Sequence, residues 1–197
     1  MNNKSLALFD FDGTICTKDS LEIFIKKLIG KHNYYLLAIS YLPEYLFTYL
    51  GKLDRSTLKQ KLLHKVFKNY KEEHLLKIGI DVSNEIINRY QKNEAMSKLK
   101  WHIKQNHDVW IVSASLDIWL APWAKLNKVN LICTESFFKD NYFHGFRNEN
   151  CNGINKVKQI QERINLKAYR NIYAYGDSAG DKEMLNIANM KFFKKFY

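Results

Sequence analysis

The sequence has few cysteines, and their spacing excludes two kinds of stabilising site. Cys16, Cys133 and Cys151 are an odd number without C-x-x-C spacing, so neither a disulfide framework nor a zinc site is predicted. The first residues also lack the apolar core of a signal peptide. We therefore expect a protein of the reducing cytoplasm.

Repeats, linkers and low-complexity segments are also missing from the chain. With 197 residues, of which 46% are hydrophobic and 26% charged, the composition is that of a soluble globular protein and not of a disordered one. This length supports one substantial core, or one domain that carries a smaller inserted unit. Two independent large domains are not expected.

Acidic residues are fewer than basic ones: 20 Asp and Glu stand against 31 Lys and Arg, which gives a net charge of +11. Such a surface attracts anions, whether phosphorylated metabolites, nucleic acid or acidic lipid head groups. The lysines are spread along the chain, and no basic cluster is interleaved with aromatic residues in the manner of nucleic-acid-binding modules. A nucleic-acid partner is therefore not expected.

Short apolar runs alternate with helical patterns, which predicts a parallel α/β sheet. Glycine and proline are scarce between Leu21 and Lys100, so this span is predicted to be an all-helical insertion. A small hairpin is expected at 142–146. The predicted strands cover 6–9, 109–112, 131–133, 171–175 and a short last segment at 192–193.

Polar clusters follow three of these strands. They are Asp10-Phe-Asp-Gly-Thr14, Ser113-Ala-Ser115 and Gly176-Asp-Ser-Ala-Gly-Asp181. The carboxyl ends of strands in an open α/β sheet line one crevice, where ligands bind. We therefore expect the three clusters to converge on one site.

Asp10 and Asp12 have different predicted tasks in phosphoryl transfer. Asp10 comes first in its loop and is the candidate nucleophile, because an aspartate carboxylate can form an aspartyl-phosphate. Asp12 is placed to protonate the leaving group and later to activate water, if neighbouring carboxylates raise its pKa.

Mg²⁺ is the predicted cofactor, because it prefers carboxylate, water and phosphate oxygens. The carboxylates of Asp10 and Asp177 and the backbone carbonyl of Asp12 are the candidate ligands. Asp181 and Ser178 are expected in a second layer around the metal, where Asp181 would orient bound water.

The substrate phosphate needs donors that stabilise its charge in the transition state. Ser113 and Lys156 would supply a hydroxyl and an ammonium, and Thr14 and Ala114 complete the predicted phosphate-binding set. Taken singly, these residues have ordinary interpretations: an acidic turn, a serine at the end of a strand and a surface lysine. Their joint occurrence in this order favours phosphoryl transfer.

Asp10-Phe-Asp-Gly-Thr14, Val112-Ser113, Lys156 and Gly176-Asp-Ser-x-x-Asp181 resemble the four motifs of the haloacid dehalogenase-like (HAD) phosphatases. The resemblance implies a doubly wound, Rossmann-like sheet, an aspartyl-phosphate mechanism and Mg²⁺. It also implies a catalytic core of residues 1–16 and 100–197, with a helical cap at 17–99. The position of the cap and the spacing of the last motif look most like the phosphoserine phosphatase branch.

The sequence departs from that branch at the residues that read the substrate. Asp19 stands where the branch has a glutamate, and Lys61 stands near the place of a cap arginine, although lysine cannot grip a carboxylate with two parallel hydrogen bonds. The second motif reads Ser-Ala-Ser instead of Ser-Gly-Gly. Phosphoserine is therefore a doubtful substrate, and a small soluble phosphate monoester is preferred.

An apolar segment, Asn33–Leu50, leaves two interpretations open. It is interrupted by Pro43 and Glu44 and is too short to span a membrane. Its two helices pack as a cap core or dimer surface, or they lie at an anionic membrane surface and bring the enzyme to a lipid phosphate or lipid-linked substrate at the inner face of the membrane.

Another class of protein also fits part of the sequence. A non-catalytic domain that binds anions or nucleic acid is the alternative from another class, and the oligomeric state is left open. His102 and His107 are expected on the surface or at helix ends. The four tryptophans are expected to anchor the core or the cap interface.

Overall fold

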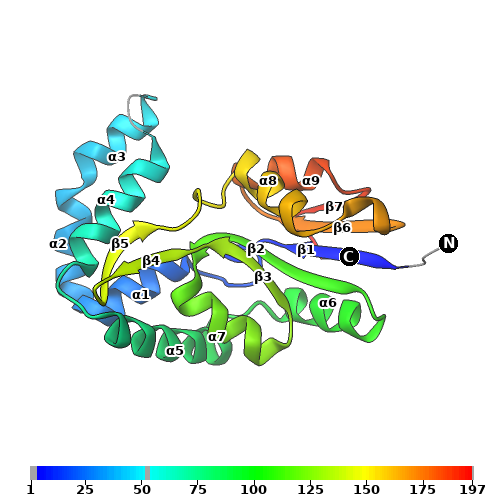
Figure 1. Ribbon diagram of the computed structural model, residues 1–197, viewed down its shortest axis with the longest axis horizontal. Helices are drawn as coiled ribbons and strands as arrows, with labels where there is room; N and C mark the ends of the chain where they lie inside the picture. The colour runs from blue at the N-terminus through cyan, green and yellow to red at the C-terminus, as the bar shows by residue number, and fades with distance from the viewer. Residues whose placement is uncertain (1–3, 52–53, 197) are drawn as a thin grey trace.

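A parallel sheet forms the centre of the molecule (Figure 1). The structure, a computed structural model, describes residues 4–51 and 54–196. Within this part of the chain, five strands form a parallel sheet, as the sequence predicts, and they lie in the order β3-β2-β1-β6-β7. The strands are β1 (Ser5–Phe9), β2 (Asp108–Leu116), β3 (Asn130–Thr134), β6 (Asn171–Gly176) and β7 (Met190–Phe193).

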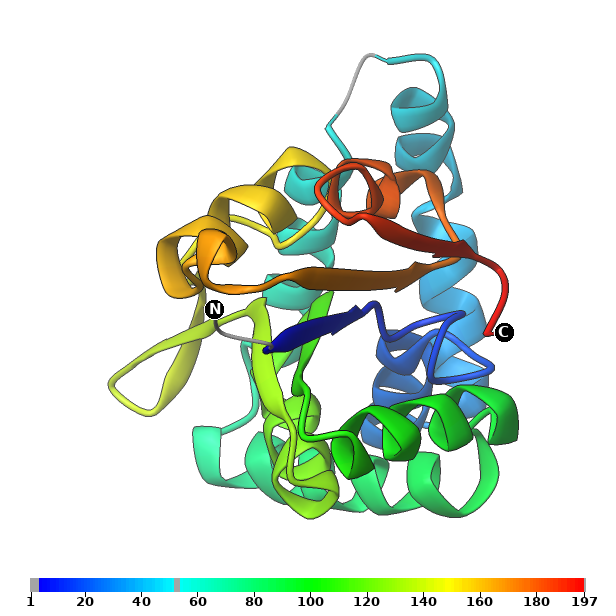
Figure 2. The ribbon, with the colours of Figure 1, turned by 90° about the vertical axis from the view of Figure 1, so that its right-hand side faces the viewer.

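Helices cover both faces of the sheet, so the predicted doubly wound architecture is confirmed (Figures 1 and 2). One face carries α8 (Ile154–Arg163) and α9 (Lys182–Asn186), and the other carries α6 (Asn93–Lys104) and α7 (Asp117–Asn127). Alternate residues of β1 serve the two sides, because successive strand residues point to opposite faces. Leu6 and Leu8 belong to the core under α8 and α9, and Ala7 and Phe9 belong to the core on the other face.

In the described residues, five helices make up the predicted insertion between β1 and α6. Asp19 caps the first of them, since its carboxylate accepts hydrogen bonds from the amides of Leu21 and Glu22 at 2.9 and 3.3 Å. The helices are α1 (Ser20–Ile29), α2 (Lys31–Ser40), α3 (Leu42–Tyr49), α4 (Arg55–Phe67) and α5 (Glu72–Arg89). The expected boundary at 99/100 falls inside α6, which packs against β2 of the sheet.

The chain crosses between sheet and insertion twice, and the two crossings lie side by side. Thr17 N donates to Tyr90 O at 2.7 Å, and Lys92 N donates to Ile15 O at 2.8 Å. Apolar packing continues across this junction, because the ring of Phe24 in α1 packs against Trp119 of α7, with ring centroids 4.8 Å apart. The insertion and the sheet therefore share one core.

A hairpin of β4 (Ser136–Lys139) and β5 (Tyr142–Phe146) is present, as predicted, but it is longer than expected: residues 142–146 form only its second strand. The hairpin packs on the insertion and not on the main sheet. Phe143 contacts Phe67 of α4 with ring centroids 5.2 Å apart. Two short 3₁₀ turns, Leu166–Ala168 and Ala179–Asp181, complete the regular structure of residues 4–51 and 54–196.

Of the two positions expected for His102, a helix end or the surface, the structure shows the helix end: the residue lies in the last turn of α6 and not on the surface. This residue is fully buried at the end of α6, because its ring fills the space behind β1 and β6. Its Nε2 atom lies 2.9 Å from the Tyr175 hydroxyl, and its Nδ1 atom lies 2.7 Å from Nδ1 of His107. Burial lowers the pKa of His102 to about 3.

The tryptophans differ in burial. Trp119 and Trp123 are fully buried, as expected of core anchors, whereas Trp101 is 41% exposed on α6.

None of the helices in the described residues is both long and apolar enough to cross a membrane.

Candidate active site

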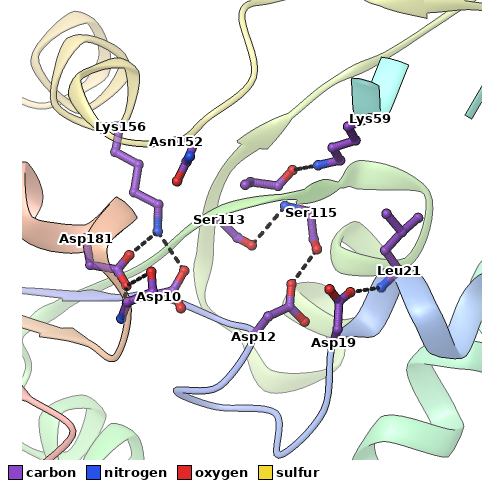
Figure 3. A pocket seen from close by; sticks show the side chains of 12 residues that line it. Asp10, Asp12, Asp19, Leu21, Lys59, Ser113, Ser115, Asn152, Lys156 and Asp181 are labelled. Atoms are coloured by element: carbon purple, nitrogen blue, oxygen red, sulfur yellow. Dashed lines mark hydrogen bonds and ion pairs between the residues drawn. The ribbon is translucent and has the colours of Figure 1, made fainter. Parts of the chain in front are cut away.

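The three polar clusters converge on one cavity at the carboxyl end of the sheet (Figure 3). The cavity has a volume of about 290 Å³ and lies between the sheet and the inserted helices. Most of its lining side chains are polar or charged, which suits an anionic ligand. The lining residues are Asp10, Asp12, Asp19, Leu21, Lys59, Ser113, Ala114, Ser115, Asn152, Lys156, Ser178 and Asp181.

Asp10 lies at the end of β1, where its amide donates to Tyr175 O of the neighbouring strand at 2.9 Å. Its Oδ1 atom is 2.6 Å from Nζ of Lys156, and the same Nζ is 2.6 Å from Oδ1 of Asp181. All three side chains are buried. One ammonium from α8 therefore links two carboxylates from different loops.

Burial shifts the pKa values of the two carboxylates upward and that of the ammonium downward. Burial raises the pKa of Asp10 to about 6, although the charge of Lys156 works against it. Burial alone would lower the pKa of Lys156, but the two neighbouring carboxylates outweigh it and raise its pKa overall. Burial would also raise the pKa of Asp181, but its bonds to Lys156 and Ser178 hold that pKa below the ordinary value.

Asp12 points toward the inserted helices and is held by serines. Its Oδ1 atom accepts from the amide of Ser20 at 2.7 Å, and its Oδ2 atom accepts from the hydroxyl of Ser115 at 2.5 Å. Burial and the charge of Asp19 raise the pKa of Asp12 to about 7. The side chain can therefore hold a proton near neutral pH, as an acid and base in turn must do.

A directional chain of hydrogen bonds stands behind Asp12. The indole N–H of Trp119 donates to Ser20 Oγ at 2.8 Å, so the Ser20 hydroxyl is free to donate to Ser115 Oγ at 3.0 Å. The Ser115 hydroxyl then donates to the carboxylate. No role of Ser20 or Ser115 at the site was predicted from the sequence, although Ser115 belongs to the second polar cluster.

Three carboxylates gather where the first and last clusters meet. Oxygen atoms of Asp10, Asp177 and Asp181 lie within 4.8 Å of one another, and hard oxygen donors of this kind suit Mg²⁺. Gly13, at φ +79°, makes the approach possible, because a Cβ atom there would lie 2.2 Å from Oδ2 of Asp177. The donor set thus fits the predicted metal.

Asp181 is fully engaged by its own surroundings. Besides Lys156, it accepts from the Ser178 amide and hydroxyl at 3.0 and 2.8 Å and from the Asp177 amide at 3.2 Å. Both of its oxygens are therefore committed to protein donors. This arrangement suits the predicted second-layer position of Asp181 and Ser178 better than direct ligation.

The predicted phosphate-binding residues occupy different positions. Ser113, Ala114 and Lys156 line the cavity, and Ser113 Oγ accepts from the Ser115 amide at 3.0 Å. Thr14 is buried outside the lining, where its hydroxyl lies 3.2 Å from Asp10 Oδ2 and 3.5 Å from Asp177 Oδ1. The position of Thr14 suits orientation of these carboxylates instead of contact with the substrate.

The two predicted specificity residues lie in different places. Asp19 lines the cavity beside Asp12, whereas Lys61 is exposed on α4 and lines a different hollow. Lys59 enters the cavity in its place, with Nζ 2.5 Å from Ala114 O and 3.2 Å from Oδ1 of Asn150. Residues two apart in a helix point in different directions, so only one of the two lysines can face the site.

A model of the haloacid dehalogenase-like hydrolase family matches residues 7–186 of the chain. Among curated proteins, Protein CicA of Caulobacter vibrioides is 28% identical over 194 residues, which cover 97% of this chain and 86% of CicA. The resemblance expected from the four motifs is thereby confirmed at the level of the family.

Solved structures share the fold. A protein of unknown function from Bordetella pertussis Tohama I superposes with a TM-score of 0.81 at 18% identity, over 94% of this chain and 87% of that one. A phosphoserine phosphohydrolase-like protein from Francisella tularensis gives 0.67 at 19% identity, over 92% and 82%. Phosphoserine phosphatase from T. onnurineus gives 0.61 at 19% identity, over 95% and 82%.

Proposed function

Because the chain belongs to the haloacid dehalogenase-like hydrolase family, we propose that it hydrolyses phosphate monoesters through an aspartyl-phosphate on Asp10. The observation that carries this proposal is the buried arrangement of Asp10, Lys156 and Asp181 in a cavity shared with Asp12. A carboxylate nucleophile, a fixed cation and a second carboxylate able to carry a proton are what the reaction requires.

In the first half-reaction, a carboxylate oxygen of Asp10 attacks phosphorus and the ester P–O bond breaks. Protonated Asp12 gives its proton to the departing alkoxide. Lys156 and the Ser113 hydroxyl face the same cavity, where they stabilise the charge on the phosphate oxygens.

In the second half-reaction, Asp12 has become a carboxylate and takes a proton from water. The water oxygen attacks phosphorus and the acyl-phosphate bond breaks, which returns the Asp10 carboxylate and releases inorganic phosphate. Asp12 ends protonated, as it began. The serine and amide donors around Asp12 hold it in place throughout.

Mg²⁺ would be held by Asp10 and Asp177, whose oxygens lie close together, and by the backbone carbonyl of Asp12. When bound, Mg²⁺ supplies positive charge that neutralises the substrate phosphate and the attacking carboxylate. Asp181 and Ser178 would orient the water ligands, and Thr14 would hold the two ligating carboxylates in register.

The preferred substrate is a small soluble phosphate monoester in the cytoplasm. Lys59 and Asp19 lie in the cavity, where they would read groups of opposite charge on the leaving alcohol. A membrane lipid phosphate is the second candidate substrate, and the apolar side chains exposed on α2 and α3 favour it. An enzyme of that kind would work at the inner face of the membrane.

A phosphate-release screen with Mg²⁺ tests the proposal. Wild type and Asp10→Asn are compared on soluble phosphomonoesters and on phosphorylated lipids in mixed micelles, with Asp81→Asn, an exposed aspartate of α5, as the control. We expect turnover by wild type and the control and none by Asp10→Asn. Normal turnover by Asp10→Asn would remove the nucleophile, and silence on every substrate would favour a non-catalytic anion-binding domain.

A further inference from the structure

The arm formed by α2, α3 and Leu50, the residue that follows α3, carries an unusual concentration of exposed apolar side chains. Among the described residues, eight of the 18 large apolar side chains that are exposed belong to this arm, with exposed fractions of 48 to 68%. These residues define the arm surface: Tyr35, Leu36, Ile39, Leu42, Tyr45, Leu46, Phe47 and Leu50. The arm stands away from the sheet, beside α4 (Figures 1 and 2).

This exposure contradicts the interpretation of the two helices as a packed cap core. None of the α2 residues is buried, and only Tyr34 and Leu37 of that helix touch the apolar core, at its edge. A concentration of exposed apolar side chains of this kind marks an interaction site.

The length of the arm suits the surface of a bilayer and not its interior. The α2 helix has ten residues and α3 has eight, and a membrane-spanning helix needs roughly 20. Tyr41, with φ −99° and ψ 3°, interrupts the two helices. Short apolar helices that cannot span are suited to lie in the interface, at the level of the head groups.

Positive charge flanks the arm surface on two sides. At the base of the arm, Lys18, Lys26, Lys27 and Lys31 line a hollow together with Tyr35. Along α4, Lys61, Lys65 and Lys68 line a second hollow with His64 and His144. Lys65 also lies 5.0 Å from the centroid of the Tyr41 ring, so basic and apolar side chains are interleaved.

Acidic residues offset only part of this charge. Glu22 and Glu85 pair with Lys26 and Lys27, and Glu44 is the one acidic residue between 31 and 51. A second copy of the chain on the arm would bring lysines against lysines, in a protein of net charge +11. Anionic lipid head groups complement the same surface.

We infer that the arm surface binds the face of a bilayer that contains anionic lipids, with its apolar side chains in the interface and the flanking lysines against the head groups. The arm follows α1, whose first residue Ser20 donates to Asp12, and it precedes α4, which carries Lys59 of the cavity. Membrane binding therefore brings the candidate active site close to the bilayer. The inference concerns binding alone and stands whether or not the chain hydrolyses phosphate.

Flotation with vesicles tests this inference on the full chain. The vesicles contain equal parts of phosphatidylcholine and phosphatidylglycerol, with pure phosphatidylcholine for comparison. The arm variant Ile39→Gln/Leu46→Gln changes side chains that are 68 and 55% exposed, and the control Ile154→Gln/Leu126→Gln changes side chains that are 67 and 59% exposed elsewhere. Because all four lie on the surface, both variants are expected to fold, and circular dichroism checks this.

We expect wild type and the control to bind anionic vesicles and the arm variant to bind on the order of tenfold or more weakly, because two apolar side chains no longer leave water. Binding should weaken on pure phosphatidylcholine and at high salt, which screens the lysines. No binding by wild type, or equal loss in both variants, would overturn the inference. One further result would overturn it: wild type forms a dimer in sedimentation velocity, the arm variant is monomeric, and wild type does not bind vesicles.

Discussion

Nζ of Lys156 lies 2.6 Å from Oδ1 of Asp10, in a contact that joins the start of α8 to the end of β1. The same ammonium lies equally close to Asp181. The exposed fraction of the Lys156 side chain is only 1%, so water cannot replace either bond. Both buried carboxylates therefore share one cation as their counter-ion.

Replacing Lys156 by Met should lower the free energy of unfolding by about 3–5 kcal/mol, because two buried carboxylates lose their counter-ion. Urea unfolding measures this loss. The matched control is Lys158→Met, two residues along α8, which removes an ion pair to Glu149 whose partners are 58 and 59% exposed. The control should change stability by at most about 1 kcal/mol, and similar losses in both variants would contradict the special position of Lys156.

Removal of metal should be visible without any substrate. Mg²⁺ that binds only the folded state raises the melting temperature, so we expect it to stabilise wild type and EDTA to reverse the effect. Asp177→Asn removes a proposed ligand and should abolish the Mg²⁺-dependent shift, whereas Asp81→Asn should retain it. A full shift in Asp177→Asn would exclude that carboxylate from the metal site.

The two cap lysines of α4 make a matched pair for substrate recognition. Lys59→Met removes an ammonium from the cavity and should raise KM about tenfold or more, since a hydrogen bond to a charged group contributes about 1.5–3 kcal/mol. Lys61→Met changes an exposed side chain that lies in another hollow and should leave KM unchanged. Steady-state kinetics on the substrate found in the screen decides between them, and equal effects would remove Lys59 from the recognition site.

The buried His102 should make the fold sensitive to acid. Burial depresses its pKa in the folded state to about 3, so below the ordinary value near 6.5 the unfolded chain binds about one proton more at this residue. Stability should therefore fall as the pH drops from 7 to 5. Unfolding curves of His102→Gln should show a smaller fall, whereas His144→Gln, an exposed histidine of β5, should keep the full slope.

The sheet and most of the site could be predicted from the sequence because their signals are local. Apolar strands that end in Asp10, Ser113 and Gly176 identify the carboxyl edge of a parallel sheet, and the order of the strands brings those ends together. The choice between Lys59 and Lys61 could not be made in this way, since it depends on the rotation of α4 against the cavity. The burial of His102 likewise depends on how α6 seats against β1 and β6.

The β4–β5 hairpin has a consequence for grafting experiments between relatives. Its Tyr142 pairs with Lys71 at the start of α5, and Gly145 lies so close to Gln60 that a Cβ atom there would be 2.7 Å from Nε2. The hairpin follows β3 in the chain, yet its partners precede β2. A chimera that exchanges the helical insertion alone would leave this surface mismatched, so a transplanted insertion must bring residues 136–146 with it.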